Sequence, residues 1–342
     1  MTAGMSAAVS ARMSVSPSAR WAVLGAGVIS GDFATALPAA ELGHLYAVGA
    51  RSTEDARAFA DRFGAPFAGT YDDILGRDDI DAVYIGTVHT THAELAIAAL
   101  ASGKAVLCEK PLTTSAADTE AVLAAAERAG LPLMEAFKYR FGPFAERLRD
   151  LIAQGAIGEV TAIDSTLGFA AAEHTGRLFD PATAGGAILD VGCYPVSFAV
   201  GVAAAAGLPV DAAAVREADG VIGDTGVDVT ASAVLDLGGA TARVRTAIVD
   251  DLPRSTVIHG TAGRLEISNP WGSRTESTDS AVLVRADGTS EHVTVPTVSP
   301  MAAEADAVIR ALREGRVEVP EMPWEHTRVV ARLLDDWLAD LR

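Results

Sequence analysis

A glycine-rich turn between a strand and a helix lies close to the start of the chain. Residues 20–24 are predicted to form a buried strand, and a Gly-x-Gly turn follows it directly before an apolar helix that continues to Leu37. In such a turn the first glycine makes the tight bend. The second lets the backbone approach a pyrophosphate at the helix N-terminus, where free N–H groups and the helix dipole favour anions. The sequence therefore predicts a dinucleotide site at Gly25, Gly27, Val28 and Ile29.

The alternation of strands and helices continues to about residue 138. Further strand-like runs lie at 44–50, 82–85, 105–108 and 133–137, separated by helical patterns at 53–63, 91–102 and 115–129. Because parallel strands need crossover connections, this alternation predicts a doubly wound parallel sheet with helices on both faces. Six strands are expected, of which five are placed here. Ser30 stands where a third glycine commonly packs helix against strand, which predicts slightly looser packing there.

The residues after the second strand bear on the choice of dinucleotide. NAD-binding domains carry an acidic residue at this point that hydrogen-bonds the ribose hydroxyls, whereas this chain has Arg51 followed by Ser52. A guanidinium beside a hydroxyl suits a 2′-phosphate, so NADP is predicted in preference to NAD. Ser52 could equally cap the helix that begins at Thr53, and the two roles are compatible.

A buried strand that ends in Glu109, Lys110 and Pro111 supplies the first candidate catalyst. The carboxyl edge of a parallel sheet is where α/β proteins bind ligands. Pro111 disfavours the helical conformation at the residue before it, so the Lys110 ammonium is expected on an extended segment at that edge. Taken alone, this sequence equally describes a solvated Glu-Lys pair at a strand end. The surrounding motifs favour a catalytic Lys110, with Glu109 beside the cofactor.

The loop after the strand at 82–85 contains Thr87, His89 and His92. Two neighbouring histidines suggest a metal site, but no third ligand has suitable spacing nearby. Helix capping or contact with the dinucleotide is therefore predicted for this loop, and no metal site is expected.

Beyond about residue 139 the pattern changes to strands with few helices between them. A helix at 143–154 is followed by strand-like segments at 160–168, 212–215, 227–237, 240–249, 256–259, 264–267, 281–285 and 292–295, and by helices at 302–313 and 324–341. Alternating polar and apolar residues predict one large, mostly antiparallel sheet with helices on one face only. The expected fold is an α/β domain at 20–138 and an α+β domain at 139–342, whose last helix is able to pack back on the first domain.

A glycine-rich segment of the second domain supplies the second candidate catalyst. Residues 185–194 lead to Pro195, which is best tolerated at the first position of a helix. Asp190 and Tyr194 would then lie at or just before a helix N-terminus, where a nearby lysine would favour the phenolate and lower the tyrosine pKa. Asp190 would orient Lys110 or the substrate. Without Lys110, a core tyrosine and a helix-capping aspartate would be the simpler interpretation.

Composition limits the partners and the compartment. Twenty-seven basic and forty-five acidic residues give a net charge of −18, which disfavours nucleic acid and membrane surfaces as partners. Two cysteines, Cys108 and Cys193, without metal-site spacing indicate a reducing, cytoplasmic compartment. The uncharged run at 191–210 contains three glycines and two prolines, which indicates a buried helix and not a membrane span.

The ends of the fold carry two further expectations. Residues 1–19, rich in Ala and Ser, lack the apolar core of a secretory signal and predict a disordered extension, in which Met13 offers an alternative start. The uncovered face of the second sheet needs a cover, and a second subunit is the simplest one. A homodimer or homotetramer is therefore expected.

These motifs together resemble the Gfo/Idh/MocA oxidoreductases, the family of glucose-fructose oxidoreductase and inositol dehydrogenase. The similarity runs from about residue 20 to the C-terminus and is most specific at residues 103–111, GKAVLCEKP, and 185–194, GGAILDVGCY. Tyr194, where inositol dehydrogenases carry histidine, is similar to the branch of dimeric dihydrodiol dehydrogenase and NADP-dependent D-xylose dehydrogenase. The segments at 86–89, 134–137, 140–141 and 269–271 also fit that branch.

The resemblance implies a hydride transfer between NAD(P) and a carbinol carbon. It makes Lys110 a catalytic lysine and Tyr194 the proton donor or acceptor, and it places the subunit interface on the second sheet. Relatives that oxidise aromatic dihydrodiols carry bulky aromatics where this chain has Lys138 and Gly142, so a sugar or polyol is expected as substrate. Trans-dihydrodiols, inositols and keto sugars are the alternatives. The residues assigned to the substrate are Lys138, Arg140 and Trp271.

Two other classes of protein deserve comparison with this expectation. Some relatives are glycosidases that use a tightly bound NAD in a transient oxidation, and such an enzyme would turn over without added cofactor. A protein that only senses NADP would need the Gly-x-Gly turn and Arg51. It would not need Lys110 together with Asp190 and Tyr194.

Overall fold

The computed structural model describes residues 18–272 and 278–341. Most of the expected disordered extension, Met13 included, lies outside the described residues. Its predicted boundary at residue 19 is slightly wrong, because Ala19 already belongs to the first strand and is fully buried.

The first domain is built on a six-stranded parallel sheet with the strand order β3-β2-β1-β4-β5-β6, which confirms the doubly wound prediction. The strand missing from the sequence pattern is β3, a run of only four residues that contains a glycine. The strands are β1 (Ala19–Leu24), β2 (Gly43–Ala50), β3 (Phe67–Thr70), β4 (Ala82–Ile85), β5 (Ala105–Glu109) and β6 (Leu133–Ala136), and the helices are α2 (Val28–Ala36), α3 (Thr53–Phe63), α4 (Tyr71–Leu75), α5 (His92–Ala101) and α6 (Ala116–Ala129).

Ser30 packs closely against the end of β4, so the looser packing expected at this position is not seen. Its side chain is fully buried, and its hydroxyl donates a hydrogen bond to the Gly86 carbonyl at 3.3 Å. A Cβ atom at Gly86 would lie 2.4 Å from the Ser30 hydroxyl oxygen. Gly86 on the facing strand end therefore makes the room that a third glycine in the turn would otherwise provide.

The second domain is built on an eight-stranded sheet with the order β14-β13-β12-β11-β7-β10-β9-β8. The sheet is mostly antiparallel, as predicted; β7 and β10 form its parallel pair. The strands are β7 (Val160–Gly168), β8 (Ala214–Ile222), β9 (Asp228–Asp236), β10 (Thr241–Ala247), β11 (Ser255–Gly260), β12 (Gly263–Ile267), β13 (Thr278–Arg285) and β14 (Ser290–Pro296). Helices α7 (Pro143–Ala153), α8 (Cys193–Ala205) and α10 (Trp324–Asp340) contact one face of it.

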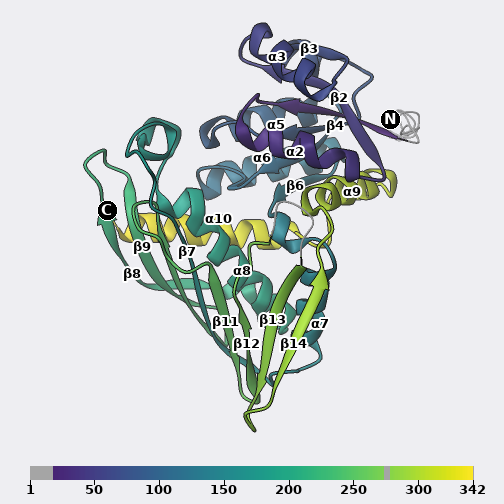
Figure 1. The fold of residues 1–342 in the computed structure, drawn as a ribbon. Coiled ribbons are helices and arrows are strands. Elements are labelled where there is room, and N and C mark those ends of the chain that lie inside the picture. The colour runs from purple at the N-terminus through teal and green to yellow at the C-terminus, as the bar shows by residue number, and fades with distance from the viewer. Residues whose placement is uncertain (1–17, 273–277, 342) are drawn as a thin grey trace, which may run out of the picture.

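The last two helices, α9 (Pro300–Arg313) and α10, join the domains (Figure 1). Helix α9 packs on β5 and α2, whereas α10 lies between β8 of the second sheet and α6 of the first domain. The indole Nε1 of Trp324 donates to the Leu133 carbonyl at 3.0 Å, and the Asp306 carboxylate accepts from the Leu42 N–H at 2.8 Å. These contacts confirm that the C-terminal helix packs back on the first domain.

The segment Pro181–Ala205 is long and apolar enough to cross a membrane by length and composition. In the structure 83% of its most apolar window is buried inside the protein. This segment therefore belongs to the core of the second domain, as the sequence predicted.

Candidate active site

The carboxyl ends of four parallel strands bring the predicted cofactor residues and Lys110 to one edge of the first sheet. Gly25 follows β1, Arg51 follows β2, Thr87 follows β4 and Lys110 follows β5. The strand order reverses between β1 and β4, and ligands of open α/β sheets bind in the crevice outside such a switch point. The expected dinucleotide site and the expected catalyst therefore lie at the same edge.

The turn between β1 and α2 fits a dinucleotide phosphate. Gly25 has φ +103°, and a Cβ atom there would lie 2.9 Å from the Gly86 carbonyl oxygen, so this position requires glycine. Helix α2 begins after Gly27 without a side-chain cap and without an acidic residue in its first turn. Val28, an apolar residue that is 83% exposed, stands directly at that helix N-terminus. The unpaired N–H groups of this helix start suit a bound pyrophosphate.

Arg51 and Ser52 occupy the end of β2 as expected, and each has its own role. The Ser52 hydroxyl caps α3, because it accepts from the Asp55 N–H at 3.1 Å. The Arg51 side chain is exposed and lies near Tyr71: burial raises the pKa of Tyr71, and the Arg51 charge opposes that rise. The helix-capping interpretation of Ser52 is confirmed, and Arg51 stays exposed at the edge where the ribose is expected.

His89 and His92 anchor the loop after β4 through contacts within the protein. The buried His92 ring contacts the Pro111 carbonyl through Nδ1 at 2.9 Å and the Thr87 carbonyl through Nε2 at 3.3 Å. His89 lies 3.8 Å from the Asp190 carboxylate, and burial together with the Lys110 charge lowers its pKa to about 3. Within residues 18–272 and 278–341 no group of three His, Cys, Asp or Glu residues could hold a metal ion.

Glu109 is a structural carboxyl under the strand end. One oxygen accepts from the Tyr84 hydroxyl at 2.7 Å, and the other accepts from the Lys110 backbone N–H at 3.3 Å. Burial raises the pKa of this carboxyl. Because both oxygens already have protein partners, Glu109 fixes the base of the Lys110 segment, and its expected contact with the cofactor stays a prediction.

Lys110 and Tyr194 converge from the two domains, as the sequence predicted. The Lys110 ammonium donates to the backbone carbonyl of Asp190 at 2.6 Å and lies 5.0 Å from the centroid of the Tyr194 ring. A cation at this distance from an aromatic face is attracted to the ring. The main chain of Asp190, and not its carboxylate, therefore positions the lysine.

The turn that carries Asp190 differs from the predicted helix start at Pro195. A π-helical turn at Ile188–Gly192 runs directly into α8, so Tyr194 lies inside the helix and Pro195 is its third residue. The missing N–H of Pro195 falls in the first turn, where N–H groups have no intrahelical partner in an ordinary helix. The wide turn directs the Asp190 carbonyl at Lys110. In a regular helix this carbonyl would accept a hydrogen bond from a backbone N–H of the same helix.

The electrostatics of the pair correct one expectation. Burial raises the pKa of Tyr194 above its ordinary value, and the Lys110 charge only opposes that rise. Burial would lower the pKa of Lys110, but the adjacent Tyr194, Cys193, Asp190 and Glu109 together raise it. The predicted effect of Lys110, which lowers the tyrosine pKa, is present, but desolvation outweighs it, so the net pKa of Tyr194 is raised. At neutral pH the pair consists of a protonated tyrosine and a charged lysine.

Arg177 belongs to the site and was not predicted from the sequence. Its guanidinium donates to the Asp190 carboxylate at 3.0 Å, while its side chain stays 55% exposed. It lies in a short 3-10 turn at Arg177–Phe179 between β7 and the π turn. No periodicity or motif separates this arginine from a surface residue, and only the adjacent glycine-rich segment could have drawn attention to it.

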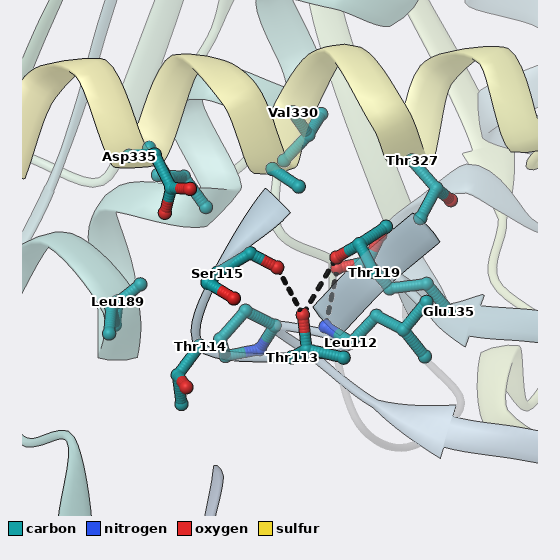
Figure 2. A pocket seen from close by; sticks show the side chains of 13 residues that line it. Leu112, Thr113, Thr114, Ser115, Thr119, Glu135, Leu189, Thr327, Val330 and Asp335 are labelled. Carbon is teal, nitrogen blue, oxygen red and sulfur yellow. Dashed lines mark hydrogen bonds between the residues drawn. The ribbon is translucent and has the colours of Figure 1, made fainter. Parts of the chain in front are cut away.

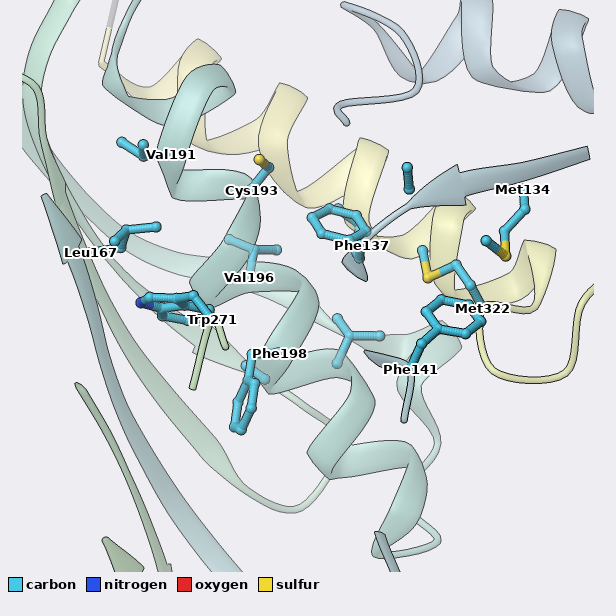
Figure 3. Packing of buried hydrophobic residues seen from close by; sticks show 14 of the residues in the cluster. Met134, Phe137, Phe141, Leu167, Val191, Cys193, Val196, Phe198, Trp271 and Met322 are labelled. Carbon is cyan, nitrogen blue, oxygen red and sulfur yellow. The ribbon is translucent and has the colours of Figure 1, made fainter. Parts of the chain in front are cut away.

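An aromatic cluster surrounds Tyr194 and contains one of the predicted substrate residues. Figure 3 labels three of its rings, those of Phe137, Phe198 and Trp271. Trp271 is 5% exposed, its ring centroid lies 5.8 Å from that of Tyr194, and its backbone carbonyl accepts from the Lys138 ammonium at 2.7 Å. Lys138 and Trp271 are thus brought together beside Tyr194. The rings of the cluster are Phe137, Tyr139, Tyr194, Phe198 and Trp271.

Arg140 does not fit its predicted role in substrate binding. The side chain is buried, at 6% exposure, and its guanidinium donates to the Ser197 carbonyl at 2.6 Å and contacts the His326 ring at 2.9 Å. Gly201 allows this approach, since a Cβ atom there would lie 3.3 Å from the guanidinium. Arg140 therefore fastens α8 to the end of the first domain and does not face a substrate.

The comparisons with known proteins match this architecture over nearly the whole chain. The family model described as "Oxidoreductase family, NAD-binding Rossmann fold" matches residues 19–137, and the GFO/IDH/MocA C-terminal domain matches residues 145–266. The chain belongs to the Gfo/Idh/MocA family of oxidoreductases. The dinucleotide-binding fold, the oxidoreductase class and the resemblance stated from the sequence are thereby confirmed.

Individual relatives and solved structures resemble the chain over more than nine-tenths of its length. Trans-1,2-dihydrobenzene-1,2-diol dehydrogenase from Mus musculus is 34% identical over 93% of this chain and 95% of its own length. KijD10, a 3-ketoreductase from Actinomadura kijaniata in complex with NADP and TDP-benzene, has a TM-score of 0.85 at 28% identity, covering 95% of this chain and 98% of that one. Aldose-aldose oxidoreductase from Caulobacter crescentus, at 24% identity, has a TM-score of 0.82 over 94% and 97% of the two chains and shares the fold.

Proposed function

We propose that this protein is an NADP-dependent dehydrogenase or reductase acting on a CH–OH group of a sugar or polyol. The observation that carries the proposal is the convergence of Lys110 and Tyr194. The Lys110 ammonium lies 5.0 Å from the Tyr194 ring, at the sheet edge where the family binds its dinucleotide. Two side chains from different domains that meet at this edge suit proton transfer beside a hydride transfer.

In the proposed mechanism the nicotinamide cofactor, when bound, supplies or takes up the hydride. Tyr194 handles the proton at its hydroxyl: it donates to the carbonyl oxygen during reduction and accepts from the substrate hydroxyl during oxidation. Because Lys110 stays charged, it stabilises the phenolate that forms on Tyr194 in the reductive direction. The Asp190 backbone carbonyl holds the ammonium in place, at 2.6 Å.

The residues around Tyr194 support a hydrophilic substrate. The Lys138 ammonium donates to the backbone carbonyl of Trp271 in the aromatic cluster at 2.7 Å, and the exposed Arg177 guanidinium lies at the Asp190 carboxylate. Hydroxyl-rich molecules find hydrogen-bond partners in such a site.

A trans-dihydrodiol is the second candidate substrate. It is favoured by the names of the relatives at 32% to 34% identity and by Trp271 beside Tyr194. KijD10 is named a 3-ketoreductase, and a keto sugar would use the same residues of this chain in the reductive direction.

A substrate panel tests these assignments. We expect NADPH to form from an aldose, an inositol or a sugar acid faster than from a trans-dihydrodiol, or NADPH to be consumed with a keto sugar. The dihydrodiol alone giving turnover would move the assignment to the second candidate. Hydrolysis of a glycoside without added NADP would indicate a glycosidase and contradict the proposal.

The choice of NADP over NAD rests on Arg51, which is exposed at the end of β2. An exposed guanidinium at this point suits the 2′-phosphate, and no acidic residue stands there to bind the ribose hydroxyls of NAD. The solved KijD10 structures contain NADP.

The oligomeric state is expected to be a dimer, or a tetramer of dimers, formed through the face of the second sheet opposite α8 and α10. On that face the Asp164 carboxylate of β7 lies 3.0 Å from the His259 ring and 3.5 Å from the Arg243 guanidinium. Val257 on β11 is the cross-strand neighbour of Asp164. A stable interface of standard size buries about 1,600 Å².

Light scattering should therefore report at least two chains per particle at micromolar concentration. Val257→Asp, which puts an unpaired charge on this face, should shift the protein towards the monomer. Ile97→Asp, at a half-exposed apolar residue on α5, serves as the control and should leave the assembly unchanged. A wild-type monomer would contradict the proposed interface.

We also propose a cytoplasmic location. Cys108 and Cys193 are both free and buried, as is usual in a reducing compartment. The net charge of −18 supports small-molecule substrates over nucleic acid or membrane surfaces as partners.

A further inference from the structure

Glu135 is a buried carboxyl that holds the segment carrying Lys110. It lies on β6, next to β5 in the sheet, and its side chain is 3% exposed. Oxygen Oε1 accepts from the backbone N–H of Leu112, two residues after Lys110, at 2.9 Å (Figure 2). This hydrogen bond fixes the backbone two residues beyond the proposed catalyst.

The second oxygen of Glu135, Oε2, is buried and has no hydrogen-bond partner in the part of the chain that the structure describes. Glu135 lines a cavity of about 10 Å³ whose other walls include the hydroxyls of Thr113, Thr119 and Thr327 (Figure 2). This volume holds about one water molecule, and the hydroxyls supply polar partners for it. A proton can therefore reach the carboxyl although the side chain is buried.

A larger cavity of about 290 Å³ adjoins the first one, because Thr114, Leu189 and Asp335 line both. Its wall includes Gly226 and Ala339, which are exposed at the surface. Glu135 thus lines a small cavity that adjoins a larger cavity whose wall reaches the surface.

Charged and titratable groups from several elements face Glu135. Burial raises its pKa to about 7, and the Leu112 N–H, the Arg140 guanidinium, the Thr327 hydroxyl and the Lys110 ammonium oppose that rise. Two thiols also interact electrostatically with Glu135: the Glu135 charge contributes to the raised pKa of Cys108 on β5 and of Cys193 on α8. The carboxyl therefore changes its charge in the neutral range, unlike the neighbouring tyrosine and lysine.

We propose that Glu135 is a positioning residue for Lys110 and that the enzyme is most active when this carboxyl is ionised. The ionised form makes a charge-assisted hydrogen bond to the Leu112 N–H and interacts favourably with the ammonium, and both effects fix the position of the Lys110 segment. Protonation weakens both. The proposal rests on the proposed function, which assigns catalysis to Lys110.

Two variants of Glu135 test the proposal in the reductive direction, where Tyr194 stays protonated. Wild-type kcat should rise as the pH increases through about 7. Glu135→Gln keeps an oxygen for the Leu112 N–H but cannot ionise. Its kcat should be nearly independent of pH in this range and match the low-pH level of the wild type, within a few-fold of the wild-type maximum.

Glu135→Leu leaves the buried Leu112 N–H unpaired. We expect kcat to fall about 10-fold or more at every pH while the KM for NADPH stays unchanged, since the dinucleotide turn is untouched. Rescue by glutamine but not by leucine distinguishes positioning from general stability, and thermal unfolding reports the folded state of both variants. Glu127→Gln, at an exposed glutamate on α6, should match the wild type throughout.

Each outcome decides the matter. A pH step that persists in Glu135→Gln, or a normal kcat in Glu135→Leu, would overturn the positioning role. If the leucine variant does not fold, the pH profile of the glutamine variant still decides.

Lys110→Met is measured in parallel. Full activity of this variant would contradict the proposed function itself. An inactive Lys110→Met together with Glu135 variants of normal activity would contradict only the positioning role of Glu135. Adding Glu135→Leu to Lys110→Met should cause no further loss.

Discussion

Tyr194→Phe is expected to lower kcat by at least about 10²-fold while NADP still binds, which is the usual scale of general acid-base catalysis. The substitution removes the hydroxyl that transfers the proton and keeps the ring in its aromatic cluster, where the centroid of Trp271 lies 5.8 Å away. Steady-state kinetics and NADP fluorescence titration on the same preparation separate the two effects. A folded, NADP-binding variant with activity within a few-fold of the wild type would rule out the proton-transfer role.

Lys110→Met should cause a loss of the same order, because the ammonium stabilises the phenolate that forms on Tyr194. The double variant should be little worse than either single one, since the two residues act as a unit. Tyr139→Phe is the matched control. It deletes a neighbouring hydroxyl that donates to Ser197 at 2.9 Å, and it should affect stability more than kcat.

The pH dependence of oxidation follows from the same pair. Burial raises the pKa of Tyr194 above its ordinary value, so the base needed for oxidation is scarce at neutral pH. Oxidation should therefore accelerate as the pH rises towards that pKa, whereas reduction should show only the step assigned to Glu135.

The sequence was sufficient for the fold and for the convergence of the two catalytic segments. The alternation of apolar and polar residues in strands and helices records which side chains are buried. That pattern was enough to predict both sheets. The short strand β3 was missed because its four residues, Phe67–Thr70, show too little alternation to recognise. The extension of β8 to Ile222 was missed for a different reason: most of its residues are exposed, so the strand carries no apolar pattern.

The electrostatics of the site could not be predicted in the same way. A lysine near a tyrosine suggests a lowered pKa, but the net direction depends on desolvation, which only the packed structure reveals. The sequence also could not show where the Arg140 side chain points. Its guanidinium is buried because Ser197 and Gly201, on a helix more than fifty positions away in the sequence, provide an acceptor and the space for it.

Arg51→Ala is expected to weaken NADP binding about 10- to 100-fold and to leave NAD binding nearly unchanged. A guanidinium paired with the 2′-phosphate makes charge-assisted hydrogen bonds worth roughly 1.5 to 3 kcal/mol. NAD lacks that phosphate and loses nothing comparable. The measurement is the Kd of each dinucleotide by calorimetry, together with kcat/KM for each.

A general loss of positive charge must be separated from the loss of this one contact. Arg57→Ala removes an exposed arginine from α3, the helix that follows Arg51. It should change the Kd of either dinucleotide little. Salt should weaken NADP binding to the wild type more than to Arg51→Ala, because screening acts on the charge pair that the variant lacks. If Arg51→Ala weakened NADP and NAD equally, the exposed arginine at the end of β2 would serve the shared part of the dinucleotide, and the preference for NADP would have to come from another residue.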